Sequence, residues 1–208
     1  MLRYIYAADL SHYPLLRETM FRDRAEQFQR RLRWEVSVDE RGWEIDEYDA
    51  LNPLYVIWER PDGTHGGSMR FLPTVGRTMV NEHFAHLTGS APICDPDIWE
   101  CTRFCLAPDS ESRIAAALML GGGELMRGFG LTHFAGVFDA RMIRIYRMIG
   151  SSPHVLGASG EGRDRISVGL WEYAPDARLR VAQSAGVSTA LSERWFARTF
   201  GEAELRLS

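Results

Sequence analysis

A nine-residue stretch near the middle of the chain, Ile98–Leu106, most restricts what this chain can fold into. Its side chains alternate with a period of two, which is typical of a strand that presents successive residues to opposite faces. On this alternation Glu100 and Thr102 lie on one face and Arg103 lies on the other, so each face carries one charge. Because ionised side chains are rarely buried without partners, Glu100 and Arg103 are candidate site residues on a rigid strand. The alternative interpretation is an ordinary edge strand with two surface charges.

Strand-like and helix-like patterns alternate on both sides of this stretch. Strands are predicted at residues 2–6, 54–59, 66–72, 132–138, 155–158 and 166–173. Helices are predicted at residues 11–32, 79–87, 141–149 and 191–200. A further helix is predicted from a cap at Asp109 or Ser110 to Phe129. The glycines at 121–123 interrupt this helix and indicate close packing or a kink there. Single strands separated by helices are typical of an α/β fold. We therefore predict one domain over residues 1–208, with a mixed, twisted sheet flanked by helices.

Composition narrows the class of protein further. A hydrophobic content of 45% over 208 residues is sufficient for a real core. The longest apolar runs are far shorter than the roughly 20 residues that cross a bilayer, and the N-terminus lacks a signal-peptide pattern. We therefore expect a cytoplasmic protein without a membrane span.

The residue types also exclude several chemistries. The chain has no Lys, which excludes a Schiff-base lysine, an ordinary pyridoxal-phosphate enzyme and a Walker-type phosphate loop. The net charge of −4 argues against a nucleic-acid binder. The three cysteines have no C-x-x-C spacing, and His83 and His86 have no third ligand, so we expect no metal site.

An acidic segment at residues 37–53 fits neither a helical nor a strand period. Glu44, Asp46 and Asp49 lie close together there, between or beside Trp43 and Tyr48. Clustered carboxylates and aromatic rings can hold a cationic or amine-bearing ligand. The alternative is an acidic surface loop.

Several motifs in order over residues 24–104 together resemble the acyl-homoserine-lactone synthase family, the autoinducer synthases of quorum sensing. The family's spaced Arg, Phe and Trp appear here as Arg24, Phe28 and Trp34, and its Glu-x-Asp-x-Tyr-Asp segment appears as residues 44–49. Its Arg-Leu-Leu-Pro-Thr run appears as residues 70–74, with the downstream Phe as Phe84. Its Glu-x-Ser-Arg-Phe strand appears as residues 100–104. Thr102 replaces the family's Ser and keeps the hydroxyl. Beyond residue 105 the resemblance is looser and rests on residues 142–145.

The resemblance implies an acetyltransferase-like fold and two substrates, S-adenosylmethionine and an acyl-carrier protein, with no permanently bound cofactor. It implies acyl transfer to the methionyl amine, followed by lactone closure and release of methylthioadenosine. Residues 1–110 are expected to handle S-adenosylmethionine, and residues 111–208 to face the acyl chain and the carrier.

The same resemblance gives each motif residue an expected role. Glu100 is the candidate base that takes the amine proton, directly or through one water, because a free α-amine with a pKa near 7.7–8.0 is largely protonated in the cytoplasm. Arg24 and Arg103 can hold the substrate carboxylate with their forked guanidinium groups. The expected catalytic set is Glu100, Arg103, Asp46, Asp49 and Arg70, and the expected substrate-binding set is Arg24, Phe28, Trp34, Phe84, Thr102 and Phe104.

A stripe of three arginines, Arg141, Arg144 and Arg147, lies along one side of the helix predicted at 141–149. A solvated helix face is the simplest interpretation. An acyl-carrier protein is strongly acidic, however, and this chain is itself net negative, so docking requires a local positive surface. The stripe is therefore a candidate docking face for the carrier.

Two other functions remain as alternatives. A coenzyme A-dependent N-acyltransferase is disfavoured because residues 112–117 lack the glycines of the usual pyrophosphate loop. A non-catalytic sensor of the nucleoside or the carrier has no need of Glu100. The sequence does not determine the length of the acyl chain or its 3-oxo substitution. It also does not determine whether the acyl donor is a carrier protein or coenzyme A.

Overall fold

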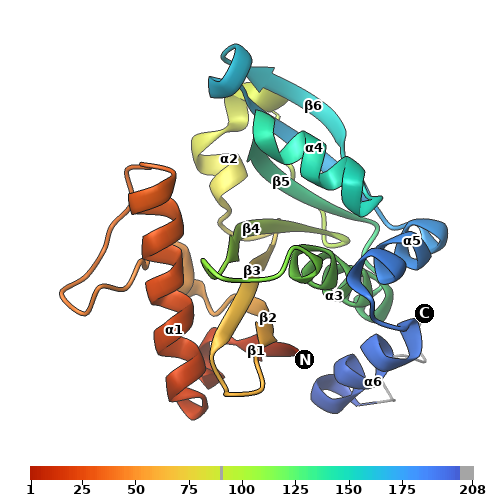
Figure 1. Ribbon diagram of the computed structural model, residues 1–208. Helices are drawn as coiled ribbons and strands as arrows, with labels where there is room; N and C mark the ends of the chain where they lie inside the picture. Colours follow the sequence, from red (N-terminus) through yellow and green to blue (C-terminus); the bar gives the residue numbers. More distant parts are fainter. Residues whose placement is uncertain (90, 202–208) are drawn as a thin grey trace.

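The computed structural model describes residues 1–89 and 91–201 and contains one seven-stranded sheet in the order β1-β2-β3-β4-β5-β7-β6 (Figure 1). Neighbouring strands are antiparallel except β4 and β5, which are parallel. The strands are β1 (Leu2–Tyr6), β2 (Leu54–Glu59), β3 (His65–Pro73), β4 (Ile98–Leu106), β5 (His133–Asp139), β6 (His154–Ser159) and β7 (Ile166–Glu172). The predicted α/β class with a mixed sheet is confirmed.

Helices cover both faces of this sheet, and the strand alternation decides which residues face which helix. The helices are α1 (Pro14–Ala25), α2 (Met79–His83), α3 (Arg113–Phe129), α4 (Ala140–Ile149), α5 (Pro175–Ala185) and α6 (Thr189–Phe200). Leu54 and Val56 of β2 join the core under α3, α5 and α6, whereas Tyr55 and Ile57 between them join the core under α1. Within the described residues, no helix is long and apolar enough to cross a membrane.

The glycines at 121–123 do not interrupt α3, which runs continuously from Arg113 to Phe129. The close packing expected of these glycines is confirmed. A Cβ atom on Gly121 would lie 2.7 Å from Val56 of β2, and one on Gly122 would lie 3.3 Å from Phe134 of β5. The helix therefore sits tightly on the sheet across both of these strands.

Other element boundaries also differ from the sequence prediction. The N-cap of α3 is Ser112, since Asp109 instead pairs with Arg60. The long N-terminal helix ends at Ala25 and continues as a turn of π-helix over Glu26–Arg31. Helix α5 was not predicted, because alanines and polar residues make up most of it and leave only a weak helical pattern.

Strands β4 and β5 pair over only three residues of each strand. The pairs join Ile98 to His133, Trp99 to Phe134 and Glu100 to Ala135. Beyond Glu100 the two strands diverge, while β5 remains paired with β7 along its whole length. This divergence opens the sheet at its centre.

Candidate functional site

A β-bulge in β4 changes the direction of one candidate side chain. Ser68 of β3 pairs with Cys105, but Arg70, two residues further along, pairs with Thr102, three residues back. Arg103 absorbs the extra residue with a φ of 51°. The prediction that Arg103 points away from Glu100 and Thr102 is therefore wrong. Arg103 donates to Asp46, and Thr102 accepts from Arg70, which also donates to Asp46.

Arg24, on α1, anchors that network. Its Nε lies 2.6 Å from Glu44, and its two terminal nitrogens lie 3.0 and 2.9 Å from the two carboxylate oxygens of Asp49. The residue is 0% exposed. Each of its three side-chain nitrogens thus already donates to a carboxylate of the protein. The expectation that Arg24 holds a substrate carboxylate directly therefore does not fit its geometry.

Arg70 and Arg103 extend the same network from the sheet. Arg70 donates to Asp46 and Asp49, and its Nε donates to the Thr102 hydroxyl at 3.0 Å. Arg103 donates to Asp46 at 2.6 Å and to Glu44 at 3.1 Å. Three arginines therefore face three carboxylates, so the charges of this buried cluster balance. We call the six residues Arg24, Arg70, Arg103, Glu44, Asp46 and Asp49 the ion cluster.

The acidic segment at 37–53 is ordered by this cluster rather than being a surface loop. Asp46 accepts from the backbone amides of Tyr48 and Asp49, and Asp49 accepts from the amide of Asp46, which forms a capping box. Burial opposes ionisation of Asp49, but Arg24 and Arg70 outweigh it and hold its pKa well below the usual range. Glu44, which the motifs placed in the segment but not in the predicted site set, is 0% exposed and belongs to the cluster.

Glu100 lies on the same side, beside the start of α2. It is 1% exposed, and its carboxylate accepts from the backbone amides of Met79 at 3.1 Å and Val80 at 2.5 Å. Glu100 therefore caps α2, whereas the side chain of Thr78, the residue before the helix, forms no capping bond. Burial raises the pKa of Glu100 to about 7, against the opposing effect of the two amides, Arg70 and Arg103. Near neutral pH this carboxyl group can both take up and release a proton.

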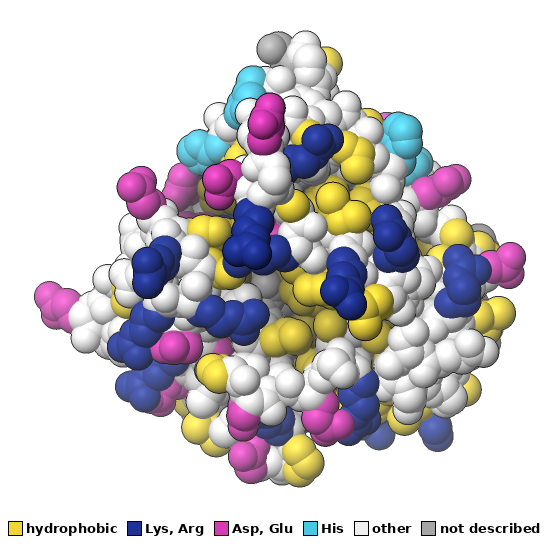
Figure 2. All heavy atoms as spheres, turned by 45° about the horizontal axis from the view of Figure 1, so that its top comes forward, with side chains coloured by type: hydrophobic (Ala, Val, Ile, Leu, Met, Phe, Trp, Pro, Cys, Tyr) yellow, Lys and Arg dark blue, Asp and Glu magenta, His cyan; other side chains and the backbone are white. Residues whose placement is uncertain are grey.

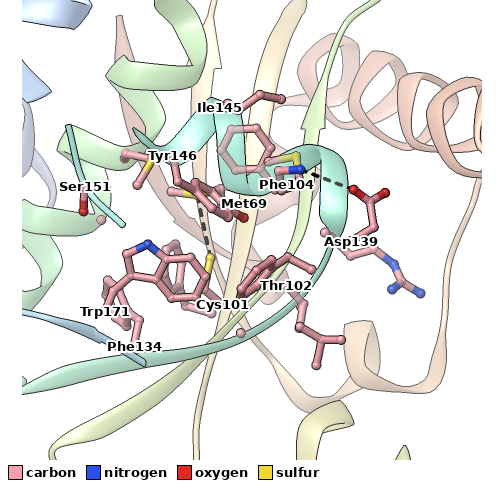
Figure 3. Close-up of a pocket in the computed structure, with 18 of the residues that line it drawn as sticks. Met69, Cys101, Thr102, Phe104, Phe134, Asp139, Ile145, Tyr146, Ser151 and Trp171 are labelled. Carbon is pink, nitrogen blue, oxygen red and sulfur yellow. Dashed lines mark hydrogen bonds between the residues drawn. The ribbon is translucent and has the colours of Figure 1, made fainter. Parts of the chain in front are cut away.

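A cavity of about 570 Å³ opens where β4 and β5 diverge (Figure 3). At one end it is lined by residues of the predicted set, namely Phe28, Trp34, Phe84, Thr102, Arg103 and Phe104. Phe28 and Trp34 stack with centroids 5.3 Å apart and planes within 2°, and Arg103 lies over the Phe28 ring. The other predicted residues do not line the cavity themselves, namely Arg24, Asp46, Asp49, Arg70 and Glu100.

The other end of the cavity is apolar and was not predicted residue by residue. Its walls come from α3, β5, α4, β7 and α5, for example Met119, Phe134, Tyr146, Trp171 and Val181. No single segment of the sequence marks these residues, since they are ordinary core-type residues that only the fold brings together.

The arginine stripe on α4 divides into two kinds of residue. Arg141 is held by Asp139, the N-cap of α4, whereas Arg144 and Arg147 are exposed and form no ion pair with any described residue. Figure 2 shows basic side chains around exposed apolar atoms on the end of the molecule that is turned forward. Met148 of α4, which is 72% exposed, and Leu156 of β6 are apolar residues exposed on these elements.

One group of exposed residues has spacing suitable for a metal ligand set, namely Glu47, Glu82 and His83. Glu82 already accepts from Arg77 and from the Tyr48 hydroxyl. His86, the second histidine of the predicted pair, is not part of the group.

Comparison with known proteins gives a consistent set of relatives. The family profile for autoinducer synthase matches residues 9–172. An acyl-homoserine-lactone synthase from Rhizobium etli is 40% identical over 166 residues, which cover 76% of this chain and 78% of that protein.

Solved structures agree with the fold. A coenzyme A-dependent acyl-homoserine lactone synthase, MesI, has a TM-score of 0.80 at 25% identity and covers 92% of this chain and 98% of its own. A second such synthase, BjaI, solved with S-adenosylmethionine and isopentyl-coenzyme A, has a TM-score of 0.78 at 21% identity, covering 90% of each chain. A putative N-acetyltransferase from Lactobacillus plantarum has a TM-score of 0.54 at 15% identity, covering 83% of this chain and 99% of its own. The expected acetyltransferase-like fold is confirmed.

Arg24→Ala is expected to destabilise the fold by about 3–5 kcal/mol, because it leaves Glu44 and Asp49 buried without one of their partners. Arg30→Ala is the matched control, because Arg30 forms only an exposed ion pair with Glu26, four residues before it. This substitution should change the free energy of unfolding by no more than about 0.5 kcal/mol. Urea unfolding of both variants measures the difference. Equal stability of the two variants would show that the ion cluster is not needed to hold the fold.

Proposed function

Because the chain belongs to the autoinducer synthase family, we propose that it transfers an acyl group from a thioester to the amine of S-adenosylmethionine and then forms an N-acyl-homoserine lactone. It is an acyltransferase of the acyl-homoserine-lactone synthase type. In the first step the amine nitrogen bonds to the thioester carbon, the carbon–sulfur bond breaks and a thiol leaves. In the second step the carboxylate oxygen attacks the methionyl carbon bonded to the sulfonium, and methylthioadenosine leaves. The observation that carries the proposal is the cavity between β4 and β5, which has Arg103 and Thr102 at one end, called the polar end below, and mostly core-type apolar residues at the other.

S-adenosylmethionine would occupy the polar end, in keeping with the division at about residue 110. Arg103 faces the cavity and is the arginine that can also contact the substrate carboxylate. The stacked rings of Phe28 and Trp34 offer a flat apolar surface to the adenine or the cationic sulfonium, and Phe84 and Phe104 complete that end. Arg24, Arg70, Asp46 and Asp49 would act on the substrate through Arg103, by fixing its position. Thr102 holds Arg70 in the same way.

Glu100 is the proposed general base. Its raised pKa, about 7, lies close to that of the amine it must deprotonate, which favours proton transfer near neutral pH. Its carboxylate is behind the cavity wall, while its neighbours Met79 and Cys101 line the cavity. A water between the amine and Glu100 would connect them, as the sequence interpretation allowed.

The acyl chain would occupy the apolar end, which residues after 111 largely build. We propose an acyl-carrier protein as the donor and the α4 arginines as part of its docking surface, because exposed arginines suit an acidic partner. An acyl-coenzyme A donor is the second candidate, and it is favoured by the likeness to MesI, which is a coenzyme A-dependent synthase.

Incubation of the purified protein with S-adenosylmethionine and matched acyl-carrier and acyl-coenzyme A thioesters tests the function. We expect acyl-homoserine lactone and methylthioadenosine in equal amounts by mass spectrometry. An acylated product without methylthioadenosine would indicate an ordinary N-acyltransferase. Binding without any product would indicate a sensor.

Glu100→Gln is expected to lower kcat by about 100-fold or more, since a carboxamide cannot accept the amine proton. In the native enzyme kcat/KM should rise with pH through an apparent pKa near 7, because the base acts when ionised, and the variant should lose this limb. Glu111→Gln, at an exposed residue on the loop before α3, is the control. Near-normal turnover of the Glu100 variant at pH 7 would show that the base is elsewhere, in water or backbone.

Charge reversal of both Arg144 and Arg147 to Glu is expected to raise KM for the acyl-carrier thioester, more at low salt than at high salt, because exposed charges are screened by ions. KM for S-adenosylmethionine should change little. Reversal of Arg22 and Arg30, exposed on the α1 side, is the matched control for net charge. Unchanged carrier KM at low ionic strength would place the docking surface elsewhere.

A further inference from the structure

One side-chain nitrogen of Arg103 has no carboxylate partner. Its Nε donates to Glu44 at 3.1 Å, and its Nη2 donates to Asp46 at 2.6 Å. Among the described residues, the only hydrogen-bond partner of Nη1 is the sulfur of Met79, at 3.9 Å. A thioether sulfur is a weak acceptor, whereas a carboxylate is a strong one for a guanidinium group. Because Arg103 lines the cavity, a carboxylate that enters can take Nη1 from the sulfur.

Met79 also contacts the candidate base, Glu100. As the first residue of α2, Met79 donates its backbone amide to Oε2 of Glu100 at 3.1 Å, and Val80 donates its amide to Oε1 at 2.5 Å. Val80 is 0% exposed, so of these two residues only Met79 also lines the cavity. Met79 therefore lies at the boundary between the cavity and the buried carboxylate.

The Met79 side chain is the part of this boundary that can move most easily. Cys101, the next residue of β4 after Glu100, points to the opposite face, where its sulfur lies 3.7 Å from that of Met69 (Figure 3). Thr102 is on the face of Glu100, but Arg70 donates to its hydroxyl oxygen at 3.0 Å. A methionine side chain is unbranched and flexible, so that of Met79 can turn while its backbone amide stays on Glu100.

We propose that Met79 is a positioning residue that gates Glu100: the carboxylate of S-adenosylmethionine takes Arg103 Nη1 from the Met79 sulfur, and the released side chain turns away and admits the connecting water. This inference rests on the proposed function and adds how the substrate reaches the base. Without substrate, the same side chain separates Glu100 from the cavity.

The proton transfer that follows balances. The ammonium group gives one proton to the water, and the water gives one of its own protons to Oε2 of Glu100, which has the longer of the two amide bonds. The neutral amine nitrogen then bonds to the thioester carbon, and the electron pair of the carbon–sulfur bond leaves with the sulfur.

Decarboxylated S-adenosylmethionine, which keeps the amine and the sulfonium, tests whether the carboxylate opens the gate. Acyl transfer to each compound is measured by mass spectrometry of the acylated product, with a saturating acyl thioester. In the native protein we expect kcat to be at least about tenfold lower for the decarboxylated compound. Loss of a binding contact alone would instead raise KM and leave kcat unchanged. Met79→Ala removes the gate, so the ratio of the two kcat values should fall toward one.

Met119→Ala is the matched control, since Met119 is also a half-buried methionine on the wall of this cavity but belongs to α3. This substitution should leave the kcat ratio at its native value. Because the ratio is taken within one variant, a general loss of activity cancels. Met79→Ser is a second small substitution with the same expected result as Met79→Ala, in case the alanine variant does not fold.

The pH profile provides an independent measurement. Without the Met79 side chain, water reaches Glu100 in the free enzyme, so burial opposes its ionisation less. The acid limb of kcat/KM, near pH 7 in the native protein, should move down by about one pH unit or more in Met79→Ala and stay in place in Met119→Ala. The substitutions leave in place the charged and titratable groups around Glu100, namely Tyr48, Arg70, Cys101 and Arg103.

Equal kcat values for the two compounds in the native protein would overturn the gate. An unchanged kcat ratio or an unchanged acid limb in Met79→Ala would do the same, while leaving lactone synthesis intact. If S-adenosylmethionine itself gives no acylated product with either class of thioester, the proposed function fails and this inference fails with it.

Discussion

The fold around the site depends on the pairing of buried and half-buried arginines with buried and half-buried carboxylates. An ionised group removed from water is stable only with compensating partners, so each member of the ion cluster constrains the others. Arg24 belongs to α1, Arg70 to β3, Arg103 to β4, and the three carboxylates to a segment with little regular structure. That segment takes a defined path because its charges must meet those arginines.

The same cluster affects the chemistry of Glu100 at a distance. Burial alone would push its pKa higher, while the backbone amides of Val80 and Met79, and to a smaller extent Arg70 and Arg103, favour the ionised form. The balance places the pKa near 7, and a general base is most effective when its pKa is close to the surrounding pH. Protein stability should therefore depend on this proton: because the folded pKa is above the unfolded value, the contribution of Glu100 is fully present below about pH 4.5 and is lost as pH rises through about 7.

Much of the sheet and most of the residues around the polar end of the cavity could be predicted from the sequence, because they follow from strand periodicity and from motifs with fixed spacing. Arg24 shows the limit of this reasoning: its place in a motif was visible, but its saturation by Glu44 and Asp49 depends on a contact between distant segments. The bulge at Arg103 escaped for a different reason, since one inserted residue leaves no trace in a pattern of period two. Tyr146 and Trp171 are 25 residues apart, in an ordinary helix and an ordinary strand, and only tertiary packing brings their rings into contact beside the cavity.

The short seam between β4 and β5 divides the sheet into two antiparallel blocks, β1-β2-β3-β4 and β5-β7-β6, joined by three residue pairs and by α3, which packs on both. A ligand lying in the gap touches both blocks and completes the interior that the sheet leaves open. Substrate occupancy and the cohesion of the two blocks are then thermodynamically linked, since whatever binds only the assembled form adds to its stability in proportion to the logarithm of its concentration. Under the proposed function the acyl chain would be a transient part of the hydrophobic core, present in each catalytic cycle and lost with the product.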